Sequence, residues 1–282
     1  MPVQAQCAYK YFDYAALFAN FHLINANNLQ MKISVGFCLF VISVLAQSAA
    51  AQNDVMVESR YVIDMPTAGM LHRGQVAFDS WIYRDGGMLL GLNVGVFPRL
   101  MFGISYGANN VIGVGSMTGQ NLPGVNIKYR VIEESFFLPA FVLGFDSQGK
   151  EGYVESAGRY VIKPPGLYIA ASKNYSFLGD LSFHGCVNYS SEDADSKSPD
   201  LSIGLEKSLG EDLAFVSSYD FGLNDRDATA GFGGEHGYLN AGLRFMPGGG
   251  FVVELDDKNL LGNEQGLPAG DRTFYVGYVQ NF

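Results

Sequence analysis

The chain has 282 residues, a formal net charge of −10 and hydrophobic side chains at 48% of its positions. Because a chain without a basic patch cannot neutralise phosphates, we do not expect a nucleic-acid-binding protein. After residue 51, no apolar stretch approaches the roughly 20 residues that a transmembrane helix needs. Glycine and aromatic residues are abundant instead, a mixture typical of strands that bury only one face in lipid.

Residues 31–51 have the organisation of a secretory signal peptide. A basic start at Met31–Lys32 precedes an apolar run of 13 residues (33–45), and Ala49–Ala51 form a small-residue cleavage site. The apolar run is shorter than a membrane-spanning helix. We therefore predict export and cleavage near Ala51–Gln52.

Residues 1–30 lie upstream of this signal. We interpret them as an extension that arises when the start of translation is assigned too early, because an apolar targeting core normally lies close to the true N-terminus. An extended signal region is the alternative. Of the three cysteines, Cys7 and Cys38 precede the cleavage site, so Cys186 alone cannot form an intrachain disulfide in the mature chain.

The mature chain is predicted to start with a periplasmic segment, residues 52–73, and to continue as a barrel over residues 74–282. Apolar and polar residues alternate in segments of about 8–12 residues, the length that crosses a membrane at a tilt. About 12 such segments predict an all-β, transmembrane antiparallel barrel. The segments are 75–84, 88–96, 100–107, 125–131, 137–146, 167–171, 181–189, 201–206, 215–223, 238–245, 251–256 and 271–282.

The connections between these segments alternate in length. Short turns are expected near 97–99, 132–135, 175–179, 207–212 and 247–249, and longer polar loops near 108–124, 147–165, 190–199, 224–236 and 257–271. Short periplasmic turns, long extracellular loops and an even strand number are typical of outer-membrane barrels.

The last strand resembles the C-terminal signature of bacterial outer-membrane barrels, which the barrel-assembly machinery reads. Phe274, Val276, Tyr278 and Phe282 share one face of this strand. The resemblance assigns the assembly signal to Tyr278 and Phe282, and Gln280 departs from it. The alternative is a soluble β-sandwich or lipocalin-like barrel with its apolar face inward. The polar exterior of such a protein would then be rich in Gly, Ser and Asn but would hold few Lys and Glu residues. This is too few charged residues for a typical solvated surface.

With the apolar face outward, nine polar residues are expected to line the lumen. They can pair into a network that partly plugs the interior, or they can line a polar path for a small solute; twelve strands lie between a filled barrel and a wide channel. The nine residues are Asp79, Lys128, Arg130, Asp146, His184, Glu206, Asp220, Arg244 and Glu254.

We expect no metal, no cofactor and no enzyme activity. His184 and Cys186 share the inward face, but no second His/Cys pair accompanies them. No Gly-x-Ser-x-Gly elbow or comparable constellation surrounds the histidines. The acidic run 190–200 begins like a calcium loop but lacks its central Gly and final Glu, so we expect a solvated surface loop.

Three stretches carry a resemblance to a known family: Met65–Leu71, Leu138–Phe145 and Leu167–Lys173. They resemble the YjbH/GfcD-like outer-membrane proteins associated with exopolysaccharide and capsule export, and the similarity covers roughly residues 60–190. Members of this family are considerably longer than this chain, and no catalytic residues carry over.

The resemblance implies an outer-membrane barrel that is an accessory or export component for surface polysaccharide. The expected partners are outer-membrane lipid, the barrel-assembly machinery and polysaccharide or other export components. Two alternatives stay open: a narrow general pore for small solutes, and a non-conducting structural barrel whose loops 190–199 and 224–236 bind partners.

Overall fold

The computed structural model describes residues 55–192, 198–226, 232–234 and 236–282. The predicted signal peptide (31–51) and the upstream extension (1–30) lie outside the described residues. The same is true of the middle of both predicted partner-binding loops, at 193–197, 227–231 and 235.

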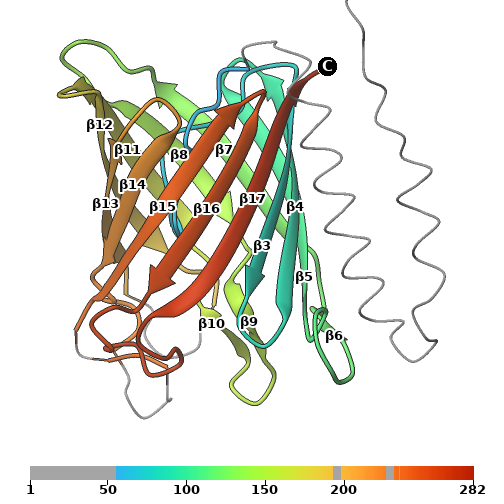
Figure 1. The fold of residues 1–282 in the computed structure, drawn as a ribbon. Coiled ribbons are helices and arrows are strands. Elements are labelled where there is room, and N and C mark those ends of the chain that lie inside the picture. Colours follow the sequence, from blue (N-terminus) through green and yellow to red (C-terminus); the bar gives the residue numbers. More distant parts are fainter. Residues whose placement is uncertain (1–54, 193–197, 227–231, 235) are drawn as a thin grey trace, which may run out of the picture. The chain divides into compact units, whose positions relative to one another are not determined.

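Twelve long antiparallel strands close into a barrel (Figure 1). Each strand pairs with its neighbours along the chain, and the first of the twelve pairs with the last, from Asn281↔Gln75 to Phe274↔Ile82. The all-β antiparallel barrel of about 12 strands predicted from the alternation is therefore confirmed. The strands are β3 (Gln75–Tyr83), β4 (Gly87–Phe97), β5 (Leu100–Asn109), β7 (Gly124–Ile132), β8 (Ala140–Asp146), β11 (Gly166–Ser176), β12 (Asp180–Tyr189), β13 (Asp200–Ser208), β14 (Leu213–Asp220), β15 (Tyr238–Gly248), β16 (Phe251–Lys258) and β17 (Asp271–Asn281).

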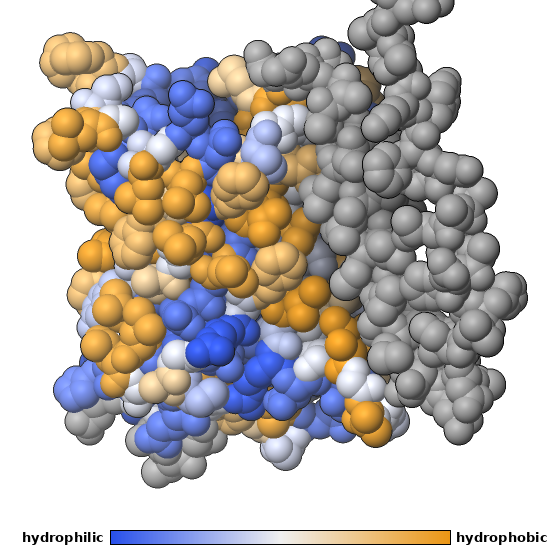
Figure 2. Space-filling view, viewed as in Figure 1, coloured by the Kyte–Doolittle hydropathy of each residue, from blue (hydrophilic) through white to orange (hydrophobic). Residues whose placement is uncertain are grey.

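The outer face of the wall is apolar. Leu90, Ile169 and Leu255, from three different strands, are 53%, 52% and 61% exposed. Orange side chains accordingly spread across the barrel wall in Figure 2. The inner face holds buried charged groups such as Asp79 and Lys128. This orientation is that of transmembrane barrels, and it rules out the soluble alternative, in which the apolar face would point inward.

The two ends of the barrel differ in their connections. Short turns such as Pro98–Arg99 lie at the end that carries the C-terminus, at the top of Figure 1. The long connections lie at the opposite end, where two of them contain additional short strands. These are β6 (Thr118–Gly119), which extends the β5 edge, and the hairpin of β9 (Lys150–Val154) and β10 (Arg159–Ile162).

The segment before the first long strand runs inside the barrel. The sequence prediction assigned residues 52–73 to the periplasm, but residues 58–71, here called the plug, contact inward-facing side chains of the wall. The plug contains a small hairpin of β1 (Tyr61–Val62) and β2 (Met65–Pro66). The physical reason is that the inner wall has an apolar surface of its own, which the plug covers.

Three apolar clusters join the plug to the wall within the described residues, and in one of them Tyr61 packs against Trp81, Tyr83 and Leu89. Val62, Ile63, Met65 and Ala68 pack against inward-facing residues of the wall, most of which are small or branched. Near the C-terminal end of the barrel, Met70 and Leu71 of the plug pack against a second set of wall residues. The wall residues are Ala140, Val142, Tyr168, Ala170, Cys186 and Val216 in the first cluster and Ala77, Met101 and Val279 in the second.

A truncation of Met70 tests the packing of the plug. Met70 is 1% exposed, so Met70→Ala should lower the free energy of unfolding by about 2–5 kcal/mol. Met56, 70% exposed in the same stretch of chain, is the matched control, and Met56→Ala should stay within about 0.5 kcal/mol of wild type. Denaturant unfolding of the detergent-solubilised protein measures both, and equal effects would contradict a packed plug.

Candidate functional site: the plugged lumen

Lys128 of β7 holds the backbone of the plug. Its ammonium group is fully buried and donates hydrogen bonds to the carbonyl oxygens of Arg60 at 2.8 Å, Thr67 at 3.3 Å and Gly69 at 3.2 Å. An ammonium group has three donors, and the plug supplies an acceptor for each. Because an unpaired buried charge is very costly, Lys128 and the folded plug depend on each other.

Arg60 of the plug reaches the wall where the barrel closes. Its guanidinium forms two hydrogen bonds with the Asp79 carboxylate, at 2.9 and 2.5 Å. Asp79 on β3 also accepts from Asn93 Nδ2 at 2.8 Å and from the Tyr275 hydroxyl of β17 at 2.7 Å. Bidentate Arg–carboxylate pairs are strong and directional, so this contact fixes the plug to the first and last strands together.

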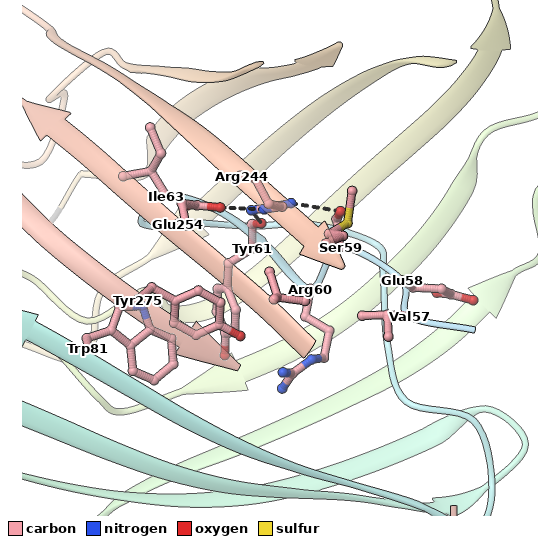
Figure 3. Close-up of a pocket in the computed structure, with 12 residues that line it drawn as sticks. Val57, Glu58, Ser59, Arg60, Tyr61, Ile63, Trp81, Arg244, Glu254 and Tyr275 are labelled. Carbon is pink, nitrogen blue, oxygen red and sulfur yellow. Dashed lines mark hydrogen bonds and ion pairs between the residues drawn. The ribbon is translucent and has the colours of Figure 1, made fainter. Parts of the chain in front are cut away.

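A second arginine, Arg244 of β15, binds the plug from the neighbouring wall (Figure 3). It contacts the Glu254 carboxylate of β16 and donates to Glu206 at 2.6 Å, to Ser59 Oγ at 2.8 Å and to the Tyr61 carbonyl at 2.8 Å. A cavity of about 30 Å³ remains between Arg244 and the Arg60 region. This volume accommodates little more than a water molecule.

Further charged pairs fix both ends of the plug. At the C-terminal end of the barrel, Arg130 of β7 contacts the Glu58 carboxylate and donates to the Ala68 carbonyl at 2.8 Å. At the opposite end Asp64 lies 3.0 Å from Lys258 of β16. Lys258 also bonds to Glu151 of β9 at 2.7 Å, so the β9–β10 hairpin joins the same network.

The nine residues predicted to line the lumen differ in their relation to the plug. Asp79, Lys128, Arg130, Glu206 and Arg244 bond to it directly. So does Asp146, through the Tyr61 hydroxyl at 3.4 Å. Glu254 acts through Arg244, and His184 bonds to Ser172, whose hydroxyl accepts from the plug amide of Ala68.

The ninth residue, Asp220, lies apart from these contacts. It borders a cavity of about 80 Å³ that Asp64, Asp200 and Glu264 also line. Burial, then Asp225 and Asp64, raise the pKa of Glu264 well above its ordinary value. Acidic side chains therefore gather at the long-loop end of the lumen, where burial favours the protonated form of Glu264.

Sequence reasoning missed Asp64, Glu151 and Lys258. Lys258 continues the inward alternation of Glu254 and Asp256, and a strand boundary two residues later would have included it. Asp64 and Glu151 lie on the plug and on the β9–β10 hairpin, which the sequence analysis treated as a periplasmic segment and a loop. No periodic signal marks either stretch.

His184 and Cys186, the two residues that suggested a metal site, are buried and packed within the protein. His184 and Cys186 are 8% and 1% exposed, and Cys186 belongs to the plug cluster. Within the described ranges, no three His, Cys, Asp or Glu side chains are in position to hold a metal ion. No helix in the described part of the chain is long and apolar enough to cross a membrane.

The two residues of the predicted assembly signal lie at the C-terminus. The ring of Tyr278 lies against that of Phe251, with their centroids 4.5 Å apart, and Phe282 is 81% exposed.

No protein-family model and no curated protein matches this chain. Among solved structures, the NanC porin has 10% sequence identity, covers 73% of this chain and 99% of its own, and has a TM-score of 0.40. The outer membrane protein Omp33 of Acinetobacter baumannii has 10% identity, with 75% and 98% covered and a TM-score of 0.40. The translocator domain of the autotransporter NalP from Neisseria meningitidis has 13% identity, with 74% and 86% covered and a TM-score of 0.35. Likenesses of this size say nothing about function.

Removing the carboxylate that faces Arg60 tests the charge network. Asp79→Asn leaves a buried guanidinium without its counter-charge, so we expect the free energy of unfolding to fall by about 3–5 kcal/mol. The control is Asp257→Asn, because the Asp257–Arg272 pair is 55% and 86% exposed, and exposed pairs contribute about 0–1 kcal/mol. Combining Asp79→Asn with Arg60→Met should recover part of the loss, and no recovery would contradict a direct pairing.

Proposed function

We propose that this protein is a bacterial outer-membrane β-barrel that is closed to solutes by its own N-terminal plug and is an accessory component in the production or export of surface polysaccharide. The single observation that carries the closure is the capture of three plug carbonyls by the buried ammonium of Lys128. A loosely lying segment would not give a buried charge all its acceptors.

The membrane location is supported by the wall. Large apolar side chains are exposed on its outer face around the barrel, and lipid is the environment in which their exposure costs least. The closed ring leaves the twelve long strands without an unpaired edge, as spanning strands require. The predicted signal peptide adds export from the cytoplasm, and the ending at Tyr278 and Phe282 adds assembly by the barrel-assembly machinery.

The polysaccharide role rests on the resemblance, whose three stretches converge in space. Met65–Leu71 belongs to the plug, Leu138–Phe145 covers all but the last residue of β8, and Leu167–Lys173 lies on β11. β8 and β11 pair with each other, and Ala140, Val142 and Ala170 pack against Met65 and Ala68. The three resembling stretches thus belong to one packing unit, in which the plug packs against β8 and β11. This favours an accessory role over conduction of the polymer through this lumen.

The two alternatives make different demands on the plug. A narrow general pore requires the plug to leave, because paired charges and apolar clusters fill the lumen around residues 58–71. A non-conducting structural barrel agrees with the plug as it stands. Its proposed partner-binding loops, 190–199 and 224–236, are only partly within the described residues.

Single-channel recording in planar bilayers tests the closure. The mature wild-type protein should give no stable conductance, whereas a variant lacking residues 53–72 should give discrete steps, because the deletion leaves β3 to β17 intact. A heat-dependent gel shift checks that each variant is folded. If the deletion variant does not fold, Arg60→Ala combined with Lys128→Met should replace it and give intermittent openings. Wild-type conductance equal to that of the variants would overturn the proposal.

Genetics tests the polysaccharide role. Deleting the gene should reduce the amount of polysaccharide at the cell surface, and the wild-type gene supplied in trans should restore it. Complementation of the same strain with the plug-deletion variant tests whether the accessory role depends on closure of the barrel. An unchanged amount of surface polysaccharide in the deletion strain would count decisively against this role. The remaining interpretation would then be a non-conducting structural barrel.

A further inference from the structure

Two neighbouring turns at the C-terminal end of the barrel carry five exposed large apolar side chains. Phe136 and Phe137, between β7 and β8, are 86% and 85% exposed, with their rings 4.9 Å apart. Leu138 follows at 53%, and in the turn between β11 and β12 Phe177 and Leu178 are 60% and 86% exposed. We call these five residues the apolar rim. By contrast, the turn between β15 and β16 consists of glycines.

The first of these turns is held beside β11. β8 pairs with β11 only as far as Ser172, although β11 continues to Ser176. Beyond that point the turn takes the place of a neighbouring strand: the Glu134 carboxylate accepts from the Asn174 amide at 2.9 Å and from its side-chain nitrogen at 2.5 Å. Lys173 contacts the Ser135 carbonyl. These contacts hold the base of the turn, from which Phe136 and Phe137 project, against β11.

The turn lies on the outer side of the wall. Lys173 and Tyr175 continue the outward alternation of Ile169 in β11, and it is the Lys173 side chain that reaches the turn. The Tyr175 ring contacts the Phe183 ring at 6.0 Å, and Phe183 is an exposed residue of the outer wall. The base of the first turn therefore lies beside the apolar outer face of the barrel. Figure 1 places both turns at the end that carries the C-terminus.

The polar groups of these turns are largely satisfied from within. The Lys173 ammonium lies 3.3 Å from the Glu134 carboxylate, so the two charges compensate each other. Lys207 of β13 donates to the carbonyl oxygens of Leu178 at 2.8 Å and Ser208 at 2.7 Å. Backbone groups bonded within the protein are what an apolar surrounding requires.

We propose that the apolar rim is a membrane anchor that inserts into the periplasmic leaflet of the outer membrane. The inference rests on the proposed membrane location and adds a specific contact to it. Five large side chains without polar atoms extend the lipid-facing wall beyond the ends of its strands on the β7–β12 side, and lipid covers them. A protein partner is the outcome that the test below distinguishes.

Tryptophan fluorescence in vesicles with brominated lipids tests the anchor. Trp81 is the single tryptophan, and it is buried in the lumen, so Trp81→Phe gives a silent background. Into it we would place Phe137→Trp, with Ile169→Trp as the lipid-facing reference and Val114→Trp, at a position 93% exposed on a long loop, as the water-facing reference. A heat-dependent gel shift confirms folding. Phe177→Trp replaces the first variant if that one fails to fold.

Bromines near the headgroup end of the acyl chain should remove most of the emission of Phe137→Trp, and its spectrum should be blue-shifted from that of Val114→Trp. Deeper bromines should quench Ile169→Trp best. If Phe137→Trp matches Val114→Trp while Ile169→Trp is quenched, the anchor is wrong and the rim is open to a protein partner. If neither is quenched, the membrane location itself is wrong. The two failures are thus distinguishable.

Discussion

A lysine ammonium with no access to water is the constraint on which the interior of this protein depends. Lys128 lies on an inner wall position, and among the described residues its acceptors are the carbonyl oxygens of Arg60, Thr67 and Gly69 rather than a carboxylate. Backbone carbonyls can serve in this way only if the plug backbone turns toward the wall. The plug conformation and the burial of the charge are therefore one arrangement, in which each stabilises the other.

The other contacts of the plug follow from its position over the closure of the barrel. Arg60 bonds to Asp79 on β3, which in turn accepts from Tyr275 on β17. β3 and β17 are the strands that meet when the ring closes. The plug thus ties together the first and last long strands, which are far apart in the sequence. Apolar packing of Met65 and Met70 then fills the spaces between the charged contacts.

The wall could be predicted from the sequence and the plug could not, for physical reasons. A strand with lipid on one side and protein on the other must alternate with a period of two, and segments such as 238–245 carry that period clearly. The plug has no regular period, because each of its residues meets a different part of the wall. One available signal was the small or branched apolar residues at inward positions, such as Ala140, Val142 and Ala170, which do not suit a water-filled lumen. The β9–β10 hairpin escaped notice because its strands have five and four residues.

The shortness of β8, which has seven residues where β11 has eleven, has a consequence for how the molecule sits in a lipid sheet. The turn that compensates for the missing length carries hydrocarbon-like side chains, so insertion of the apolar rim would make the apolar belt taller on the β7–β12 flank. A bilayer of even thickness can match an uneven apolar belt only if the barrel tilts or if the bilayer thickens locally, each at a modest energetic cost per ångström of mismatch. Such a tilt would turn the long-loop end of the barrel, where Asp200, Asp220 and Glu264 lie, obliquely to the cell surface.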